Sequence, residues 1–123
     1  MKINNVTRAT FKEMVANAPR PAVVVFSSPA CHLCDAVKPV IEELASDYKN
    51  QLLFYTVNVI AEQKLASTFL DEGDGVPTIV IFRDKKYKKL PEPAEADPVS
   101  WYSRDFLKEN FNKYIEKKKE VRK

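Results

Sequence analysis

Residues 22–34 read Ala22-Val23-Val24-Val25-Phe26-Ser27-Ser28-Pro29-Ala30-Cys31-His32-Leu33-Cys34. The unbroken apolar, mostly β-branched run at 22–26 predicts a strand that is covered on both faces. A helical pattern begins at Cys34, so the two cysteines lie where a helix starts. Two thiols three positions apart at such a place can close into a disulfide. The positive end of the helix dipole also stabilises the first thiol, Cys31, as its thiolate.

Working outward, the spacing of apolar residues predicts the other elements. One helical stripe follows the cysteines and consists of Val37, Val40, Ile41, Leu44, Ala45 and Tyr48. Further patterns predict helices at 7–18, 61–70 and 103–118 and strands at 52–59, 78–82 and 87–90. Crossovers between strands through a helix require parallel pairing, whereas a hairpin at Asp84-Lys85 adds antiparallel pairing. We therefore expect an α/β fold: a mixed central sheet of four to five strands with about four helices on both faces.

Length and charge narrow the class of protein. A chain of 123 residues predicts a single domain, 1–123, with a core of its own. The net charge of +3 is accounted for by the basic segment Glu116–Lys123, which we expect to be a frayed helix end. The near-neutral remainder argues against a nucleic-acid partner. No signal-peptide or membrane-spanning run is present, so we expect a cytoplasmic protein with no membrane partner.

A second motif lies far downstream, where Gly75-Val76-Pro77-Thr78 opens the strand at 78–82. Together with four other features it gives the chain its resemblance to a known family. The other features are the apolar run at 22–26, Cys31-x-x-Cys34, Pro39 in the following helix, and Asn58 at the end of the next strand. The chain resembles the thioredoxin superfamily over almost its whole length. The resemblance implies a thioredoxin-like fold and thiol–disulfide exchange on protein disulfides. It implies no cofactor beyond the Cys31–Cys34 disulfide, no metal, and a thioredoxin-reductase-type electron donor. We expect a monomer, although the sequence leaves the oligomeric state open.

Thiol–disulfide exchange assigns different roles to the two cysteines. Cys31, at the helix start, is the expected nucleophile, and its thiolate is the reactive form. Cys34, one turn into the helix, is expected to be more buried and to resolve the mixed disulfide. His32 and Leu33 are candidate tuning residues for the reduction potential. A protonated His32 would stabilise a nearby thiolate, whereas the alternative role is an exposed, uncommitted side chain.

The resemblance also implies a substrate-binding surface opposite the cysteines. It predicts a cis peptide bond between Val76 and Pro77, with Pro77 lying against the dithiol and excluding metal ions. The backbone of Val76 would pair with an extended substrate segment, and Gly75 and Ala30 would complete the surface. A proline that merely heads a strand is the alternative interpretation.

Several positions depart from the pattern of the family. Ala30 replaces a common tryptophan, and residues 32–33 replace a common Gly-Pro. Val25 stands where relatives often bury an aspartate, which predicts a resolving step that is slower or assisted by water. An insertion at Pro91–Ser100 replaces a glycine of the family. Trp101, just past it, is expected to anchor the last helix, with a lid near the dithiol as the alternative.

Two other function classes remain open on the sequence. The first is a redox-inert thioredoxin-like module that keeps the fold and binds a partner, which the departures from the family pattern favour. The second is metal binding through the two cysteines, which would need two further ligands.

Overall fold

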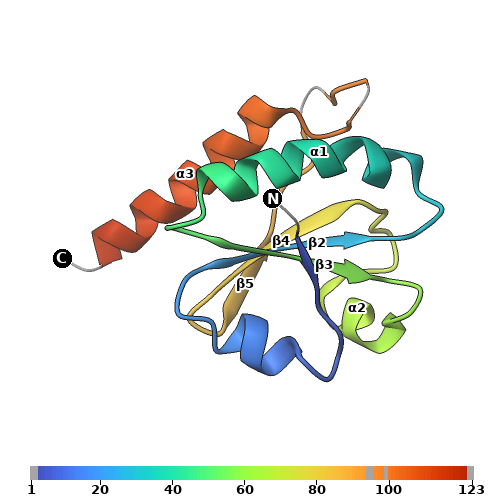
Figure 1. The fold of residues 1–123 in the computed structure, drawn as a ribbon, viewed down its shortest axis with the longest axis horizontal. Coiled ribbons are helices and arrows are strands. Elements are labelled where there is room, and N and C mark those ends of the chain that lie inside the picture. Colours follow the sequence, from blue (N-terminus) through green and yellow to red (C-terminus); the bar gives the residue numbers. More distant parts are fainter. Residues whose placement is uncertain (1–2, 94–95, 99, 122–123) are drawn as a thin grey trace.

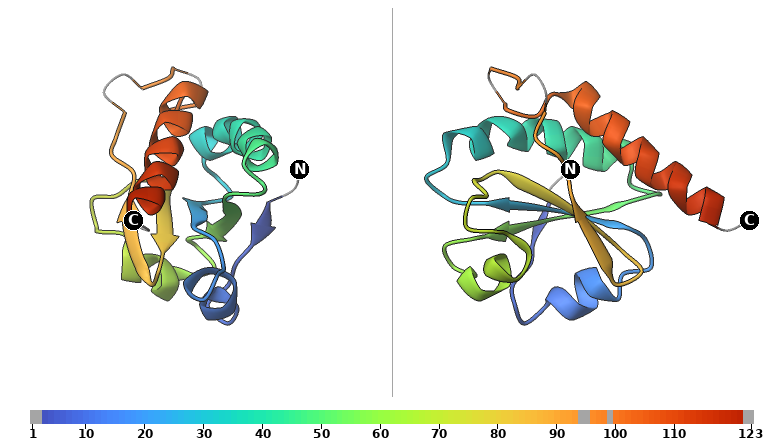
Figure 2. Two further views of the ribbon diagram at one scale, coloured as in Figure 1. Left: turned by 90° about the vertical axis from the view of Figure 1, so that its left-hand side faces the viewer. Right: turned by 180° about the vertical axis from the view of Figure 1, so that it is seen from behind.

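A computed structural model of the chain describes residues 3–93, 96–98 and 100–121. Its elements are β1 (Asn4–Asn5), η1 (Lys12–Ala16), β2 (Ala22–Ser27), α1 (His32–Asp47), β3 (Leu53–Asn58), α2 (Gln63–Phe69), β4 (Thr78–Arg83), β5 (Lys86–Lys89) and α3 (Arg104–Val121). The five strands form one mixed sheet in the order β1-β3-β2-β4-β5. Helices α1 and α3 cover one face, and η1 and α2 cover the other (Figure 1, Figure 2). The predicted α/β fold is confirmed.

The register of the central strands determines which loops meet. β2 runs parallel to β3 and antiparallel to β4, and Phe26 is paired with Thr78. The end of β2 therefore lies beside the start of β4. Because the chain reaches Cys31 from the end of β2 and Pro77 immediately precedes β4, these two distant residues are brought to the same edge of the sheet.

Strand β2 contributes to both halves of the core, as its continuous apolar run predicts. Val23 and Val25 pack with α1 and α3, whereas Val24 and Phe26 pack with the residues of α2 and η1. Every residue from Ala22 to Phe26 is buried. The alternation of side chains along a strand gives each face of the sheet its own apolar cluster. Burial on both faces makes β2 a rigid support for the loop that carries the cysteines.

Three elements differ from the sequence-based expectations. The helix predicted at 7–18 is a short π-helix, η1, and it begins only at Lys12 because Thr7 and Thr10 first close a hydrogen-bonded turn. The helix after the cysteines begins at His32 rather than at Cys34. β1 was not predicted, because its two exposed residues have no apolar pattern and are held only by backbone pairing with Tyr55 and Thr56.

The C-terminal half follows the prediction closely. Asp84 and Lys85 have positive φ angles of 54° and 65°, which suits a tight turn between β4 and β5. Leu107 and Phe111 of α3 are fully buried against the sheet. Helix α3 continues to Val121, but the side chains of 116–121 and the whole of 122–123 lie outside the described residues, so the expected fraying stays a prediction. Across the described part of the chain, no helix has the length and apolar character needed to cross a bilayer.

Candidate active site

The site is built on the first turn of α1. Cys31 is the N-cap of this helix, in an extended conformation with φ −98° and ψ 112°. Its sulfur accepts a hydrogen bond from the backbone N–H of Cys34 at 3.0 Å. The two cysteines form a disulfide with Cα atoms 5.1 Å apart. When the disulfide is reduced, the same N–H group and the helix dipole favour the thiolate of Cys31.

The two sulfur-bearing residues differ in exposure. Cys34 is only 7% exposed, whereas Cys31 is partly exposed. The difference follows from the helix, since the N-cap position faces the loop edge and a residue one turn later faces the sheet. An external disulfide therefore reaches Cys31 more readily than Cys34.

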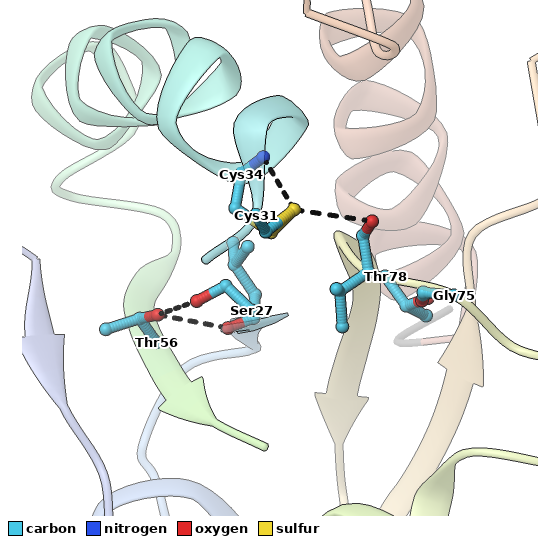
Figure 3. The surroundings of a disulfide bond; sticks show 8 residues. Ser27, Cys31, Cys34, Thr56, Gly75 and Thr78 are labelled. Atoms are coloured by element: carbon cyan, nitrogen blue, oxygen red, sulfur yellow. Dashed lines mark hydrogen bonds between the residues drawn. A yellow bond between two sulfur atoms is a disulfide. The ribbon is translucent and has the colours of Figure 1, made fainter. Parts of the chain in front are cut away.

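The loop before β4 lies directly opposite Cys31. The Val76–Pro77 peptide bond is cis, and Pro77 is buried. The carbonyl oxygen of Val76 lies 3.6 Å from the sulfur of Cys31, the contact drawn to the right of the cysteines in Figure 3. The thiol of reduced Cys31 can donate a hydrogen bond to this carbonyl. The backbone N–H of Val76 has no hydrogen-bond partner among the described residues.

The other predicted site residues differ in how they relate to this contact. Leu33 is partly buried and lines a pocket together with Gly75, Val76 and Pro77. Ala30 and His32 are exposed. Within the described residues the side chain of His32 forms no hydrogen bond or ion pair, so the structure adds no contact to its proposed tuning role.

A pocket that the sequence did not predict lies behind Cys34. A pocket of about 280 Å³ reaches this cysteine. Its lining residues are Ile3, Asn5, Val25, Ser27, Ser28, Pro29, Cys34, Asp35, Val37, Lys38, Ile41, Thr56 and Asn58. Val25 thus lines the same pocket as Cys34, together with several polar residues. The pocket is large and polar enough to hold water.

Two hydroxyl groups line this pocket beside Val25. Thr56 donates a hydrogen bond to the carbonyl oxygen of Val25 at 3.1 Å, and its oxygen lies 3.3 Å from the hydroxyl of Ser27 (Figure 3). Because the proton of Thr56 points to Val25, Ser27 donates to Thr56 and keeps its lone pairs available. Period-two spacing could have indicated Ser27, since it lies two residues after Val25 on one face of the strand.

The described part of the insertion (residues 91–93, 96–98 and 100) lies on the α1 side of the sheet, between β5 and α3 (Figure 1). Trp101, which follows it, has a positive φ of 62° and packs against the apolar cluster beneath α1 and α3. This packing agrees with the predicted anchoring of the last helix, which stays a prediction. Trp101 also lines the pocket that Leu33 shares with the loop before β4.

A cluster of charged residues fixes the loop that precedes Gly75. The ammonium group of Lys89 lies 2.8 Å from Asp71 and 2.6 Å from Asp74. Its hydrogen bond holds the pKa of the Asp74 carboxyl below the ordinary value, and the hydrogen bonds to Asp71 and Asp74 raise the pKa of Lys89. Among the described residues, no group of three or more His, Cys, Asp or Glu side chains is placed to hold a metal ion.

Comparison with known proteins agrees with this geometry. A family model described as thioredoxin matches residues 2–99. The chain belongs to the thioredoxin family. Thioredoxin 1 of Synechococcus elongatus is 37% identical over 79 residues, which cover 64% of this chain and 72% of that protein. Thioredoxin of Pyropia yezoensis is 31% identical over 115 residues, 94% of this chain and 99% of that protein. Thioredoxin of Pseudomonas aeruginosa is 32% identical over 82 residues, 67% of this chain and 74% of that protein.

Family membership and the Cys31–Cys34 pair together give the chemistry. The protein is a thiol–disulfide oxidoreductase of the thioredoxin family. Thioredoxins use their own disulfide and need no further cofactor. The predicted superfamily and the predicted class of enzyme are confirmed.

Proposed function

We propose that this protein reduces disulfide bonds in protein substrates by dithiol exchange through Cys31 and Cys34. The observation that carries the proposal is the placement of the Cys31 sulfur. Cys31 is partly exposed, and its sulfur accepts a hydrogen bond from the backbone N–H of Cys34 in the first turn of α1. The same sulfur lies 3.6 Å from the carbonyl oxygen of Val76, while Cys34 is buried. A nucleophile and its resolving partner need this division of exposure.

The electrons move in two exchange steps. The thiolate of Cys31 attacks one sulfur of the substrate disulfide, so that a bond between Cys31 and the substrate forms and the first substrate thiolate leaves. The thiolate of Cys34 then attacks the sulfur of Cys31 and releases the second substrate thiolate. Two electrons pass from the dithiol to the substrate, and the protein is left with its Cys31–Cys34 disulfide. A second dithiol, from a thioredoxin-reductase-type enzyme, returns it to the reduced form.

Val76 supplies the contact that aligns the substrate. Its N–H, which has no hydrogen-bond partner in the described part of the chain, and its carbonyl oxygen lie on the backbone segment that faces Cys31. An extended substrate segment can pair with these groups as an added strand would. This pairing needs no particular side chain, which suits an enzyme that acts on many protein disulfides. Gly75 and Ala30, both exposed, leave room for the segment on either side.

Reduction of insulin by dithiothreitol tests this function against a redox-inert interaction module. We expect catalytic amounts of the protein to accelerate the precipitation of reduced insulin several-fold over dithiothreitol alone, because Cys31 is partly exposed and is stabilised as a thiolate. The same amount of protein with both cysteines alkylated is the control. A rate equal to that of dithiothreitol alone would favour the module and contradict the proposal.

We also propose that water in the pocket behind Cys34 assists the resolving step. Val25 offers no carboxylate there, so the proton of the Cys34 thiol needs another acceptor. Ser27 keeps lone pairs available beside this pocket, and Asp35 lines it as well. A water molecule held by Ser27 can accept the proton of Cys34 and pass it toward solvent.

Ser27→Ala tests this step. We expect resolution to slow about threefold to tenfold near neutral pH, the change that one hydrogen bond of about 1 kcal/mol produces. An aryl disulfide reagent releases one coloured thiolate on attack by Cys31 and a second on resolution, so stopped flow separates the two phases. Ser67→Ala, on α2 across the sheet, is the matched control. An unchanged second phase in Ser27→Ala would remove Ser27 from the mechanism.

The close spacing of the two cysteines bears on the compartment in which the protein acts. A lone, closely spaced cysteine pair suits a reducing compartment, where such a pair is catalytic rather than structural. We therefore propose that the protein acts in the cytoplasm, and as a monomer. Cell fractionation and sedimentation velocity test these two statements.

A further inference from the structure

A second pocket, of about 260 Å³, adjoins the reactive disulfide on the side of the insertion. Its lining residues are Leu33, Asp74, Gly75, Val76, Pro77, Thr78, Lys89, Leu90, Glu92, Trp101 and Tyr102. Leu33 belongs to the cysteine motif, and Val76 belongs to the loop that faces Cys31. Glu92 belongs to the insertion, and Trp101 is the residue that follows the insertion. The pocket therefore joins the reactive centre to the segment in which this chain departs from its family.

The charges in this pocket do not cancel. The ammonium group of Lys89 is already engaged by Asp71 and Asp74. Glu92 is exposed and has no hydrogen bond or ion pair to any described residue. The pKa of the Tyr102 hydroxyl is raised, first by burial and then in part by the nearby carboxylates of Glu92 and Asp74. The charged lining residues are thus Asp74 and Glu92 against Lys89, so the lining is net negative, and Glu92 has no hydrogen-bond or ion-pair partner among the described residues.

The walls of the pocket suit a long side chain with an apolar stem. Leu33, Pro77 and Leu90 provide aliphatic surface, and the partly buried Trp101 provides an aromatic one. Lysine and arginine side chains bury their methylene stems along such surfaces and keep the charged group in water. An aromatic ring also attracts a cation placed over its face.

We propose that this pocket binds a lysine or arginine side chain of the substrate polypeptide, close to the substrate cysteine that Cys31 attacks, with Glu92 as its charged partner. The inference rests on the proposed function, because it names a preference among protein substrates. It assigns to the insertion a role in substrate choice, and Glu92 is the specificity-determining residue.

The geometry of an added strand makes this arrangement possible. A substrate segment paired with Val76 lies beside Cys31, since the Val76 carbonyl is 3.6 Å from that sulfur. Neighbouring residues along an extended segment point to opposite sides. The substrate cysteine can therefore face Cys31 while a nearby side chain points to the pocket that Val76 also lines.

Three peptide disulfides test the proposal. Each is a symmetric dimer of one short cysteine peptide, and the three differ only in whether lysine, norleucine or glutamate stands on each side of the cysteine. The reduced protein is mixed with each disulfide, and the released peptide thiol is measured chromatographically in a single turnover. At low ionic strength we expect the lysine peptide to react about twofold to fivefold faster than the norleucine peptide, and the glutamate peptide more slowly. The preference should shrink as salt is added.

Glu92→Gln and Glu13→Gln form a matched pair of variants. Both remove one negative charge from the protein, but Glu13 lies on η1, across the sheet from the pocket. We expect Glu92→Gln to lose most of the lysine preference and to leave the rate with the norleucine peptide within about twofold. Glu13→Gln should behave as the unaltered protein does. An equal loss in both variants would show that net charge acts rather than the pocket, and would overturn the proposal.

The remaining outcomes separate this inference from the proposed function. Equal rates with all three peptides would overturn the lysine pocket, while the oxidoreductase would stand. A preference for norleucine over lysine would also overturn it, since it would make the pocket an apolar subsite. Failure to reduce any peptide or insulin would instead contradict the proposed function itself.

Discussion

Cys34→Ser is expected to turn the enzyme into a trap for its substrates, and Cys31→Ser is expected to abolish reduction. In Cys34→Ser the nucleophile remains at the N-cap, where the backbone N–H of residue 34 still reaches its sulfur, but the resolving thiol is gone. Mixed disulfides with substrate proteins should accumulate and be visible on non-reducing gels. In Cys31→Ser the acceleration of insulin reduction should fall to the rate of dithiothreitol alone.

The two variants serve as controls for each other. Each keeps one cysteine and changes one sulfur to oxygen, so the fold and the remaining thiol content are matched. Cys34 is 7% exposed, and we expect Cys31→Ser to capture few substrates. Adding dithiothreitol should release every captured protein from Cys34→Ser. Equal capture by both variants would contradict the assignment of Cys31 as the attacking residue.

The sequence predicts most of the sheet because its central strands carry strong local signals. β2 and β4 are continuous apolar runs, and the turn at Asp84-Lys85 fixes the hairpin with β5. β1 could not be predicted, since its two exposed asparagine residues are held only by backbone pairing with β3. The π-helix η1 differs from the α-helix expected at 7–18. Its apolar spacing indicates a helix but does not distinguish i+4 from i+5 hydrogen bonding.

The sequence predicts the site residues that stand in recognisable motifs, but not the contacts that form only when the chain folds. Cys31, Cys34 and the loop at 75–78 stand in recognisable motifs, and the structure places them together. The pairing of Ser27 with Thr56 depends on the register of β2 against β3, which no local pattern reveals. Glu92 and Leu33 line one pocket although they are far apart in the sequence, and no local pattern reveals this. Pairwise contacts between distant segments are therefore what the structure adds.

Phe111→Ala is expected to cause the largest loss of stability among the substitutions considered, about 3–5 kcal/mol in the free energy of unfolding. Phe111 is fully buried, and its ring makes edge contacts with Tyr48 at 5.7 Å and with Phe54 at 5.6 Å. The substitution removes ring contacts that help to hold α3 against the end of α1 and against β3. Small domains are stable by about 5–15 kcal/mol, so this loss is a large share of the total. Urea unfolding followed by circular dichroism measures it.

Phe111→Leu and Lys108→Ala separate packing from helix propensity. The leucine variant keeps most of the apolar volume and loses the ring contacts, so we expect a loss of about 1–2 kcal/mol. Lys108 is exposed on the same helix, and its replacement should change stability by less than about 0.5 kcal/mol. Because Phe111 packs on Tyr48, which follows the last turn of α1, while Cys31 caps its first, the folded fraction of Phe111→Ala should reduce insulin at the unaltered rate. A loss of activity without a loss of stability would show instead that α3 positions the disulfide directly.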